Sequence, residues 1–275
     1  MSIIASIVYG LLSGITEFFP ISARAHQRIM LHLCGRTTRD PLQDLLVHIA
    51  ILISLLYFSR SMLNKMRLLR NRINDRRYQR AHFRKNAFDS RLIRTASVPL
   101  LIGSLLYIAT LKFENSLPTV ALFLILNGAI LLLVEHIPHG NRDASTMSGM
   151  DGIIMGVGGS LAFLPGLSRT GMISAYCVGR GADKQTAINW AITLAIPALA
   201  VMIFLDIILL ITSGIVATSF ATVIGYFFGA MAAFGGTYLG ITLVRIVLSR
   251  SGFSGFAYYS FGAALLSFIL YLITW

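Results

Sequence analysis

The sequence predicts an all-α integral membrane protein with six transmembrane helices and two re-entrant helix pairs, arranged as an inverted repeat. Three observations support this fold class. Of the 275 residues, 56% are hydrophobic and 12% are charged, whereas a soluble domain usually has about 25% charged residues. Several apolar runs reach the roughly 20 residues that a membrane-crossing helix needs. Two other apolar runs are interrupted near their middle by proline and polar residues.

The expected spans are the apolar runs that are long enough and continuous enough to cross a bilayer. They are residues 42–59, 92–112, 117–137, 186–212, 216–244 and 255–275. The interrupted runs are residues 2–38 and 151–180. We expect each of these two to enter the membrane and return to the same side, because irregular backbone is tolerated at membrane depth only inside protein or beside water.

The positive charge is concentrated in one predicted loop, residues 60–94. This loop has twelve Lys and Arg against Asp75 and Asp89, so it carries +10 of the net +12. A basic loop between apolar spans is typical of the cytoplasmic side, which argues against a nucleic-acid partner. We therefore predict a multi-pass protein of the inner or plasma membrane, with this loop cytoplasmic. The loop could also contact anionic lipid headgroups, although a pure topology signal is the simpler interpretation.

This orientation predicts an inverted repeat with halves 1–140 and 141–275. Three spans separate the two interrupted runs, so the first run opens to the outside and the second to the inside. Phe19-Pro20-Ile21-Ser22-Ala23-Arg24 aligns with Leu164-Pro165-Gly166-Leu167-Ser168-Arg169, with arginine four residues after proline in both. Inverted repeats with broken helices are a common membrane transporter plan, and the site then lies where the repeats face each other.

The interrupted runs contain the polar groups that we expect to form a functional site, because ionisable groups inside a membrane are costly. These candidates are Thr16, Glu17, Ser22, Arg24, His26, Arg28, Ser168, Arg169 and Thr170. The forked guanidinium group of arginine binds phosphate oxygens well, and so do the free backbone N–H groups of a helix N-terminus after a broken turn. A carboxylate could hold a divalent cation or act as a base, and serine or histidine could accept a phosphoryl group. The pattern predicts a site for a phosphorylated ligand. The alternative is that the arginines lie at helix ends and extend to the membrane surface, while the other polar groups cap the re-entrant turns.

Two stretches resemble the signatures of a known family. Gly14-Ile15-Thr16-Glu17-Phe18-Phe19-Pro20-Ile21-Ser22, with His26 four residues further on, is similar to EGxTEFLPxSSTGH, the first signature of the undecaprenyl pyrophosphate phosphatase family of the bacitracin-resistance type. Pro165-Gly166-Leu167-Ser168-Arg169-Thr170-Gly171 is similar to its second signature, PGxSRSG. Their separation, the length and the hydropathy also fit, so the resemblance covers essentially the whole chain.

The resemblance implies a fold, an activity and a set of site residues. Members have six spans, two re-entrant pairs and inverted repeats. They remove the terminal phosphate of a C55 isoprenoid diphosphate, which recycles the lipid carrier of cell-wall precursors. The resemblance implies that Arg169 holds the diphosphate, and that Glu17 and His26 act in the chemistry or place a divalent cation such as Mg²⁺ or Ca²⁺. Ser22 and Ser168 match serines of the two signatures. The implied partners are this lipid substrate and the surrounding membrane lipids.

The chain departs from the first signature at positions that bear on the chemistry. Ser13 stands where the family has its first glutamate, Ala23 replaces the second serine, and Arg24 replaces the threonine. Ser22 or His26 would then have to accept the phosphoryl group. Arg24 could take over part of a cation's role in neutralising phosphate. Hydrolysis is our first hypothesis, and a non-hydrolytic carrier or flippase for phosphorylated isoprenoid lipid is the alternative.

Several other residues allow two interpretations. Asp206 could be a proton relay or a helix–helix hydrogen bond. Asp44 and His48 share one helical face and could support the site or form a plain interhelical pair. The GxxxG pairs at 225/229 and 236/240 are typical of packing faces, within one chain or in a homodimer. Cys34 and Cys177 match no metal spacing and are expected to be buried free thiols.

Overall fold

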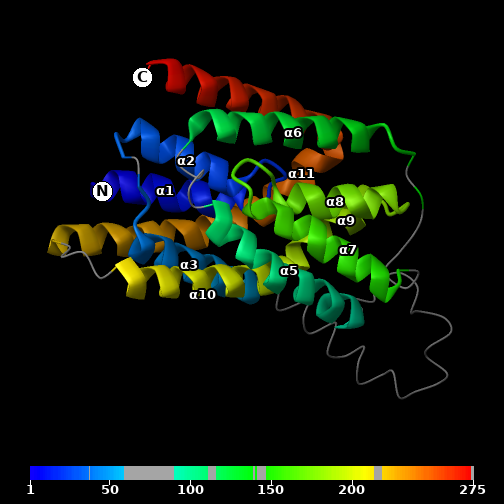
Figure 1. Ribbon diagram of the computed structural model, residues 1–275, viewed down its shortest axis with the longest axis horizontal. Helices are drawn as coiled ribbons and strands as arrows, with labels where there is room; N and C mark the ends of the chain where they lie inside the picture. The colour runs from blue at the N-terminus through cyan, green and yellow to red at the C-terminus, as the bar shows by residue number, and fades with distance from the viewer. Residues whose placement is uncertain are drawn as a thin grey trace.

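The computed structural model describes residues 1–36, 38–58, 90–110, 116–138, 140, 147–213 and 219–273. All elements of these residues are helical (Figure 1). They are α1 (Ile3–Thr16), α2 (Ala23–Leu33), α3 (Pro41–Phe58), α5 (Ser90–Thr110), α6 (Leu117–Glu135), α7 (Gly149–Ser160), η2 (Leu161–Phe163), α8 (Arg169–Gly179), α9 (Lys184–Thr193), α10 (Ala195–Ser213) and α11 (Phe220–Ile273). Most of the predicted basic loop lies outside the described residues, and its last residues, 90–94, begin α5.

Four helical stretches in the described part of the chain are long and apolar enough to cross a membrane. They are α3, α6, α9 together with α10 (Lys184–Ser213), and α11. Three of the predicted spans, 42–59, 117–137 and 186–212, coincide with the first three of these stretches. The predicted span 92–112 is largely covered by α5, which contains Pro99 and has only a shorter apolar part. The chain is thus an all-helical membrane protein, while the number of six spans stays a prediction.

The last two predicted spans, 216–244 and 255–275, belong to one element. α11 runs from Phe220 to Ile273, and its only interior residue with non-helical dihedrals is Gly252, at φ 60° and ψ −157°. That region of φ strongly favours glycine. Both ends of α11 lie on the left of Figure 1, so the chain reverses direction at this kink. Residues 245–254, between the two predicted spans, are therefore helical except at the Gly252 kink.

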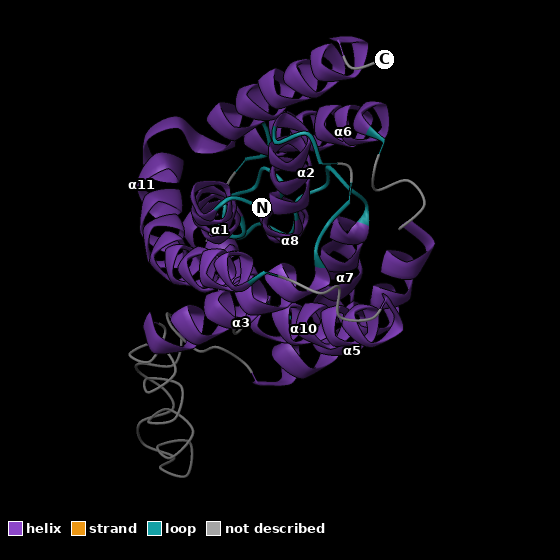
Figure 2. Cartoon of the chain, turned by 90° about the vertical axis from the view of Figure 1, so that its left-hand side faces the viewer, coloured by secondary structure: helices purple, strands orange, loops and turns teal. Residues whose placement is uncertain are grey.

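The two interrupted runs form the broken helices that the sequence predicts. In the first, α1 ends at Thr16 and α2 begins at Ala23; in the second, α7 and η2 precede α8. Pro20 and Pro165 lie between the paired helices, because proline cannot continue a helix and disfavours helical backbone in the residue before it. Figure 2 shows these loops at the centre of the molecule, enclosed by the surrounding helices. Whether the halves are inverted copies stays a prediction.

Glycines let α1 pack directly against α11. A Cβ added to Gly10 would lie 1.9 Å from the Gly229 carbonyl oxygen, and one added to Gly14 would lie 2.4 Å from that of Ala233. From the other side, a Cβ added to Gly236 would lie 2.7 Å from the Leu11 carbonyl oxygen of α1, and one added to Gly240 would lie 2.7 Å from that of Ile15. The GxxxG faces are therefore used within one chain, and this contact fixes the helix that carries Glu17 at its end.

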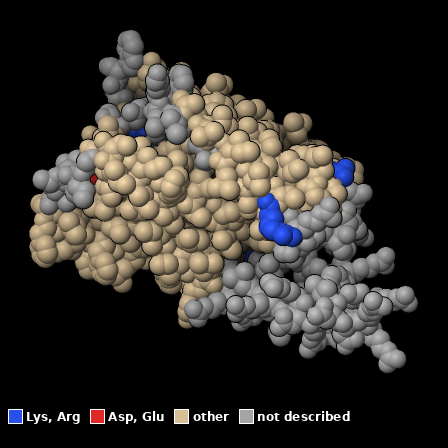
Figure 3. All heavy atoms as spheres, turned by 60° about the horizontal axis from the view of Figure 1, so that its bottom comes forward, with Lys and Arg blue, Asp and Glu red and all other residues tan. Residues whose placement is uncertain are grey.

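The surface agrees with a lipid-facing protein. The described side chains on the face drawn in Figure 3 are almost all uncharged, and only a few Lys, Arg, Asp or Glu atoms are visible on it. Both cysteines are free, and Cys177 is buried as expected. The expectation of a buried thiol is wrong for Cys34, which is exposed. It follows the last residue of α2 and precedes Gly35, whose φ is +68°, so it lies in a surface turn.

Candidate active site

The turns of the two broken segments meet at one buried amide. Asn127, in the middle of α6, is fully buried. Its Nδ2 donates to the Pro20 carbonyl oxygen at 2.9 Å, and its Oδ1 accepts from the Ser168 backbone N–H at 3.0 Å. The Ser168 hydroxyl also donates to the Phe19 carbonyl oxygen at 3.1 Å. Asn127 was not among the predicted site residues, although it is the only amide side chain in the apolar run 117–137.

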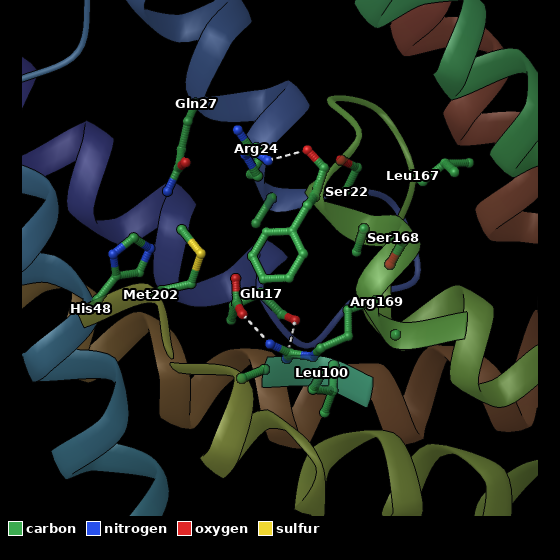
Figure 4. Close-up of a pocket in the computed structure, with 15 residues that line it drawn as sticks. Glu17, Ser22, Arg24, Gln27, His48, Leu100, Leu167, Ser168, Arg169 and Met202 are labelled. Carbon is green, nitrogen blue, oxygen red and sulfur yellow. Dashed lines mark hydrogen bonds and ion pairs between the residues drawn. The ribbon is translucent and has the colours of Figure 1, made fainter. Parts of the chain in front are cut away.

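A cavity opens beside this junction (Figure 4). It lies between the two broken segments and the helices α3, α5 and α10. Its lining residues are Glu17, Ser22, Ala23, Arg24, Gln27, His48, Leu100, Gly159, Ala162, Phe163, Leu167, Ser168, Arg169, Ala198 and Met202. Five of the predicted site residues thus share one cavity, although they come from runs about 150 residues apart.

An ion pair connects the two segments across the cavity. Arg169 Nη1 lies 2.7 Å from Glu17 Oε1, and Nη2 donates to the Glu17 carbonyl oxygen at 3.4 Å. Thr170 Oγ1 donates to the same carbonyl oxygen at 3.3 Å. Among the described residues, the buried Nε of Arg169 has no hydrogen-bond partner. Since a buried donor without an acceptor is costly, an oxygen of a bound anion would complete this guanidinium's bonding.

Arg24 is the second cation of the cavity. Its Nη1 donates to the Phe163 carbonyl oxygen at the end of η2, and its guanidinium carbon lies 4.7 Å from the centre of the Tyr107 ring. Cation and ring at this separation attract each other. Arg24 and Arg169 are the cationic residues of the lining, and Glu17 is its only carboxylate. Two positive charges and one negative charge leave the described lining with a net charge of +1, which favours an anion.

Ser22 has an unusual backbone conformation. It is the only described non-glycine residue with positive φ, at φ 66° and ψ 96°. It is 2% exposed, caps α2 by accepting from the Ala25 backbone N–H at 3.4 Å, and lines the cavity. Such backbone strain is found most often at functional sites. Ala23, where the family has its second serine, also lines the cavity and offers only a methyl group.

Several predicted site residues lie nearby but outside the lining. Both ring nitrogens of His26 are engaged: Nδ1 lies 2.8 Å from the Ser22 carbonyl oxygen and Nε2 lies 2.9 Å from the Tyr259 hydroxyl. Thr16 donates to the Leu12 carbonyl oxygen at 2.7 Å. Thr170 and Arg28 are likewise absent from the lining. His26 therefore connects the first turn to α11, and its imidazole does not face the cavity.

Ser13, at the position of the family's first glutamate, is part of a buried hydrogen-bond chain. Its hydroxyl donates to the Tyr9 carbonyl oxygen at 2.7 Å and accepts from Gln27 Nε2 at 3.0 Å. Gln27 also lines the cavity, where its buried Oε1 lacks a hydrogen-bond partner among the described residues. Gln27 therefore connects the Ser13 hydroxyl to the cavity.

His48 and Asp206 form the helix–helix hydrogen bond that the sequence allowed as one alternative. His48 Nδ1 of α3 lies 2.5 Å from Asp206 Oδ2 of α10. His48 also lines the cavity, whereas Asp44 does not. Asp44 is bound instead by Arg39 at 2.6 Å and by the Tyr9 hydroxyl at 2.5 Å. His48 therefore lines the cavity and also forms an interhelical pair, whereas the sequence allowed either support of the site or a plain interhelical pair.

A divalent cation would find few protein ligands here. Within the part of the chain that the structure describes, no three His, Cys, Asp or Glu side chains come together as a metal site. Glu17 is the one carboxylate of the described lining, and Arg169 already pairs with it. Any cation at this position would depend mainly on ligand phosphate oxygens and water, as Mg²⁺ often does.

The whole chain is similar to known proteins. Residues 6–266 match the model of the family described as bacitracin resistance protein BacA. The chain is 29% identical to undecaprenyl-diphosphatase 1 of Shouchella clausii, over 98% of this chain and 96% of the relative. It is 28% identical to undecaprenyl-diphosphatase of Methanobrevibacter smithii, over 98% of each chain. It is 30% identical to undecaprenyl-diphosphatase 2 of Halalkalibacterium halodurans, over 98% of this chain and 97% of the relative. The chain belongs to the bacitracin resistance protein BacA family.

Proposed function

We propose that this protein is a membrane phosphatase that hydrolyses undecaprenyl diphosphate to the monophosphate and inorganic phosphate, and so recycles the lipid carrier of cell-wall precursors. The observation that carries the proposal is the cavity between the two broken segments, where Arg24, Arg169, Glu17 and Ser22 converge. Membership of the family and the names of the relatives support the same activity.

The cavity fits the diphosphate end of such a lipid. Arg169 and Arg24 provide forked donors for phosphate oxygens, and both α2 and α8 begin at the cavity with a serine cap, at Ser22 and Ser168. The N-terminus of a helix favours an anion. The apolar lining from α5 and α10, including Leu100 and Met202, suits the first carbons of the lipid tail. Nothing in this lining selects a tail of a particular length.

Ser22 is our preferred phosphoryl acceptor. Its oxygen would form a bond to the terminal phosphorus while the bridging P–O bond breaks, and the bonding electron pair would leave with the isoprenyl monophosphate. Water would then displace the serine oxygen and release inorganic phosphate, which regenerates Ser22. His26 is less suitable, because it is not among the lining residues and both of its ring nitrogens already have hydrogen-bond partners.

The roles of Glu17 and Arg24 determine how much a divalent cation could contribute to hydrolysis. Glu17 would have to give up its bond to Arg169 in order to bind a cation or act as a base. Arg24 adds a fixed positive charge where the family signature has threonine. We propose that Arg24 takes over part of the neutralisation of the diphosphate, so that Mg²⁺ or Ca²⁺ stimulates hydrolysis but is not strictly required.

A non-hydrolytic carrier or flippase is the second candidate, and one observation favours it. Ala23 lines the cavity at the position of the family's second serine, so the site lacks the hydroxyl that the signature has there. Such a protein would still bind phosphorylated isoprenoid lipid through Arg169. An inverted repeat of residues 1–140 and 141–275 would suit movement of the lipid between the two faces of the membrane.

The test is phosphate release from a C55 or C15 isoprenoid diphosphate by the purified protein, with and without a chelator and with added Mg²⁺ or Ca²⁺. The proposal predicts steady turnover, with residual turnover in the chelator, and a strong loss in Glu17→Gln. The exposed Arg250 offers a control, and Arg250→Ala should match the wild type. Binding without any phosphate release would contradict hydrolysis and support the carrier; a strict cation requirement would contradict the role given to Arg24.

A further inference from the structure

We propose that His48 is a catalytic general base of this site and that Asp206 is its positioning residue. This inference rests on the proposed hydrolase function. His48 comes from α3, outside both broken segments, and lines the cavity together with Glu17 and Ser22 (Figure 4). It is the only imidazole among the described lining residues.

Asp206 fixes which nitrogen of His48 carries the proton. Asp206 is 1% exposed, and its Oδ2 lies 2.5 Å from His48 Nδ1. An ionised carboxylate can only accept hydrogen bonds, so Nδ1 carries the hydrogen of the neutral ring. Nε2 is then the basic nitrogen. No hydrogen bond to Nε2 is found among the described residues, so this nitrogen is available to a group in the cavity.

The other carboxylates near His48 already have hydrogen-bonded or ionic partners. Asp44, one turn earlier on α3, is held by Arg39 and by Tyr9 of α1. Glu17, which follows α1, is paired with Arg169 across the cavity. These bonds leave His48 as the lining residue best able to take a proton without first losing an ionic partner.

The other helix that packs on α3 places its titratable groups away from His48. Tyr226 of α11 donates to Asp40, just before α3 begins. Tyr238 of α11 lies against Phe58, where α3 ends, with ring centres 4.5 Å apart. Arg24 completes the charged lining from α2. The local environment of His48 is thus dominated by the Asp206 carboxylate, which stabilises an imidazolium.

Each bond change at the terminal phosphorus is accompanied by a proton transfer. As the Ser22 oxygen bonds to the terminal phosphorus, its hydroxyl proton passes to His48 Nε2 through water in the cavity, because the two side chains lie on opposite sides of it (Figure 4). The bridging P–O bond breaks, and its electron pair remains on the isoprenyl monophosphate, a stable anion that needs no proton to leave. In the second half of the reaction, Nε2 returns its proton to the Ser22 oxygen while a second proton, from the attacking water, leaves with inorganic phosphate or solvent.

The main test variant is His48→Gln, whose amide can still donate to Asp206 but cannot accept a proton. We expect kcat to fall about 100-fold or more, as for loss of a general base, with KM changed only a few-fold. The wild-type kcat should decrease towards low pH as His48 becomes protonated, and this decrease should be absent from the residual activity of the variant. His136→Gln is the matched control, because His136 is exposed at the end of α6.

Asp206→Asn and a double variant test the positioning role. Asp206→Asn should lower kcat in the wild type and have little further effect in His48→Gln, because residues that act as a unit are not additive. His48→Ala removes the ring, and added imidazole should restore part of its kcat. A purely structural pair would give neither non-additivity in kcat nor rescue by imidazole.

Each outcome bears on one proposal. His48→Gln with wild-type kcat and an unchanged pH profile would overturn the role of His48 while leaving the hydrolase intact. If His48→Gln does not fold, failure of imidazole to rescue a folded His48→Ala would overturn it as well. If the wild type and His136→Gln both release no phosphate while binding the lipid, the hydrolase proposal itself fails, and the general base with it.

Discussion

The two broken segments of this protein are built alike but hold their turns in different ways. Each has a short apolar helix, a turn with proline, a serine cap and a second helix of 11 residues, α2 or α8. In the second turn the left-handed backbone position is Gly166, at φ +125°. In the first turn it is Ser22, at φ +66°. A side chain with a hydroxyl thus occupies a conformation that glycine would adopt at lower cost.

This difference assigns different tasks to the two turns. In the second, a Cβ on Gly166 would lie 2.5 Å from Phe123 Cβ, so the glycine lets the turn pack tightly against α6. Arg169, three residues further on, lines the cavity. In the first, backbone strain is accepted in order to keep the Ser22 hydroxyl at the cavity. In the proposed function, the second turn would act as a clamp for phosphate, and the first turn would carry the group that reacts.

The largest effect is expected when the clamp is lost. Arg169→Ala should lower kcat/KM by at least about 10³-fold, because it removes a forked donor aimed at the charge of the transition state. It also leaves Glu17 facing the diphosphate without a counter-charge. Arg169→Lys should recover only part of the loss, since an ammonium cannot reproduce the fork. Phosphate release from isoprenoid diphosphate measures both; near-wild-type activity of Arg169→Ala would contradict the clamp.

Replacing Ser22 by glycine separates strain from chemistry. Ser22→Gly should lower kcat by at least about 10²-fold, because the acceptor hydroxyl is gone. Its thermal stability should equal or exceed that of the wild type, because relief of strain of about 1–3 kcal/mol offsets the entropic cost of glycine. Ser22→Ala should lose activity equally but keep the strain. Full activity in both variants would show that Ser22 is not the acceptor.

The amide that joins the two turns should matter for folding more than for chemistry. Asn127→Leu removes three hydrogen bonds, to Pro20, Ser260 and Ser168, and leaves the buried Pro20 carbonyl and Ser168 N–H without a partner. We expect a loss of unfolding free energy of about 2–4 kcal/mol, from roughly 1–3 kcal/mol for each orphaned group. Thermal unfolding in detergent measures this. A stability equal to the wild type would mean that the turns are held together by other contacts.

The smallest effect is expected at the cap of α8. Ser168→Ala removes the acceptor of the Gly171 N–H and the donor to the Phe19 carbonyl. Loss of an N-cap costs about 1 kcal/mol, and Arg169 would keep its place in the cavity. kcat should therefore fall less than tenfold while the unfolding temperature drops slightly. A loss of activity as large as that of Ser22→Gly would contradict the distinction between the two turns.

The sequence predicted the parts of the site that follow directly from local chemistry. Arginine four residues after proline, with a serine between them, was enough to identify both turns, and the long apolar runs located most spans. Gly252 was missed as a kink because a single glycine inside an apolar helix gives no sign of its φ. Cys34 was misplaced because the apolar residues around it do not show where α2 ends.

Residues contributed by distant helices were harder to find. Asn127 and His48 reach the junction or the cavity from α6 and α3, and no spacing in the sequence connects them with residues 17–24. Each does carry a usable signal, which is a polar side chain in the middle of an apolar run. His26 shows the opposite case: it belongs to the signature, yet its ring is used to bind Tyr259.

The most direct test compares phosphate release and lipid binding in the same detergent, for the wild type, Arg169→Ala and Arg250→Ala, with an isoprenoid diphosphate as substrate. A hydrolytic site between the two turns predicts turnover in the wild type and in Arg250→Ala, and loss of both turnover and tight binding in Arg169→Ala. Tight, Arg169-dependent binding without phosphate release from any of the three proteins would contradict it.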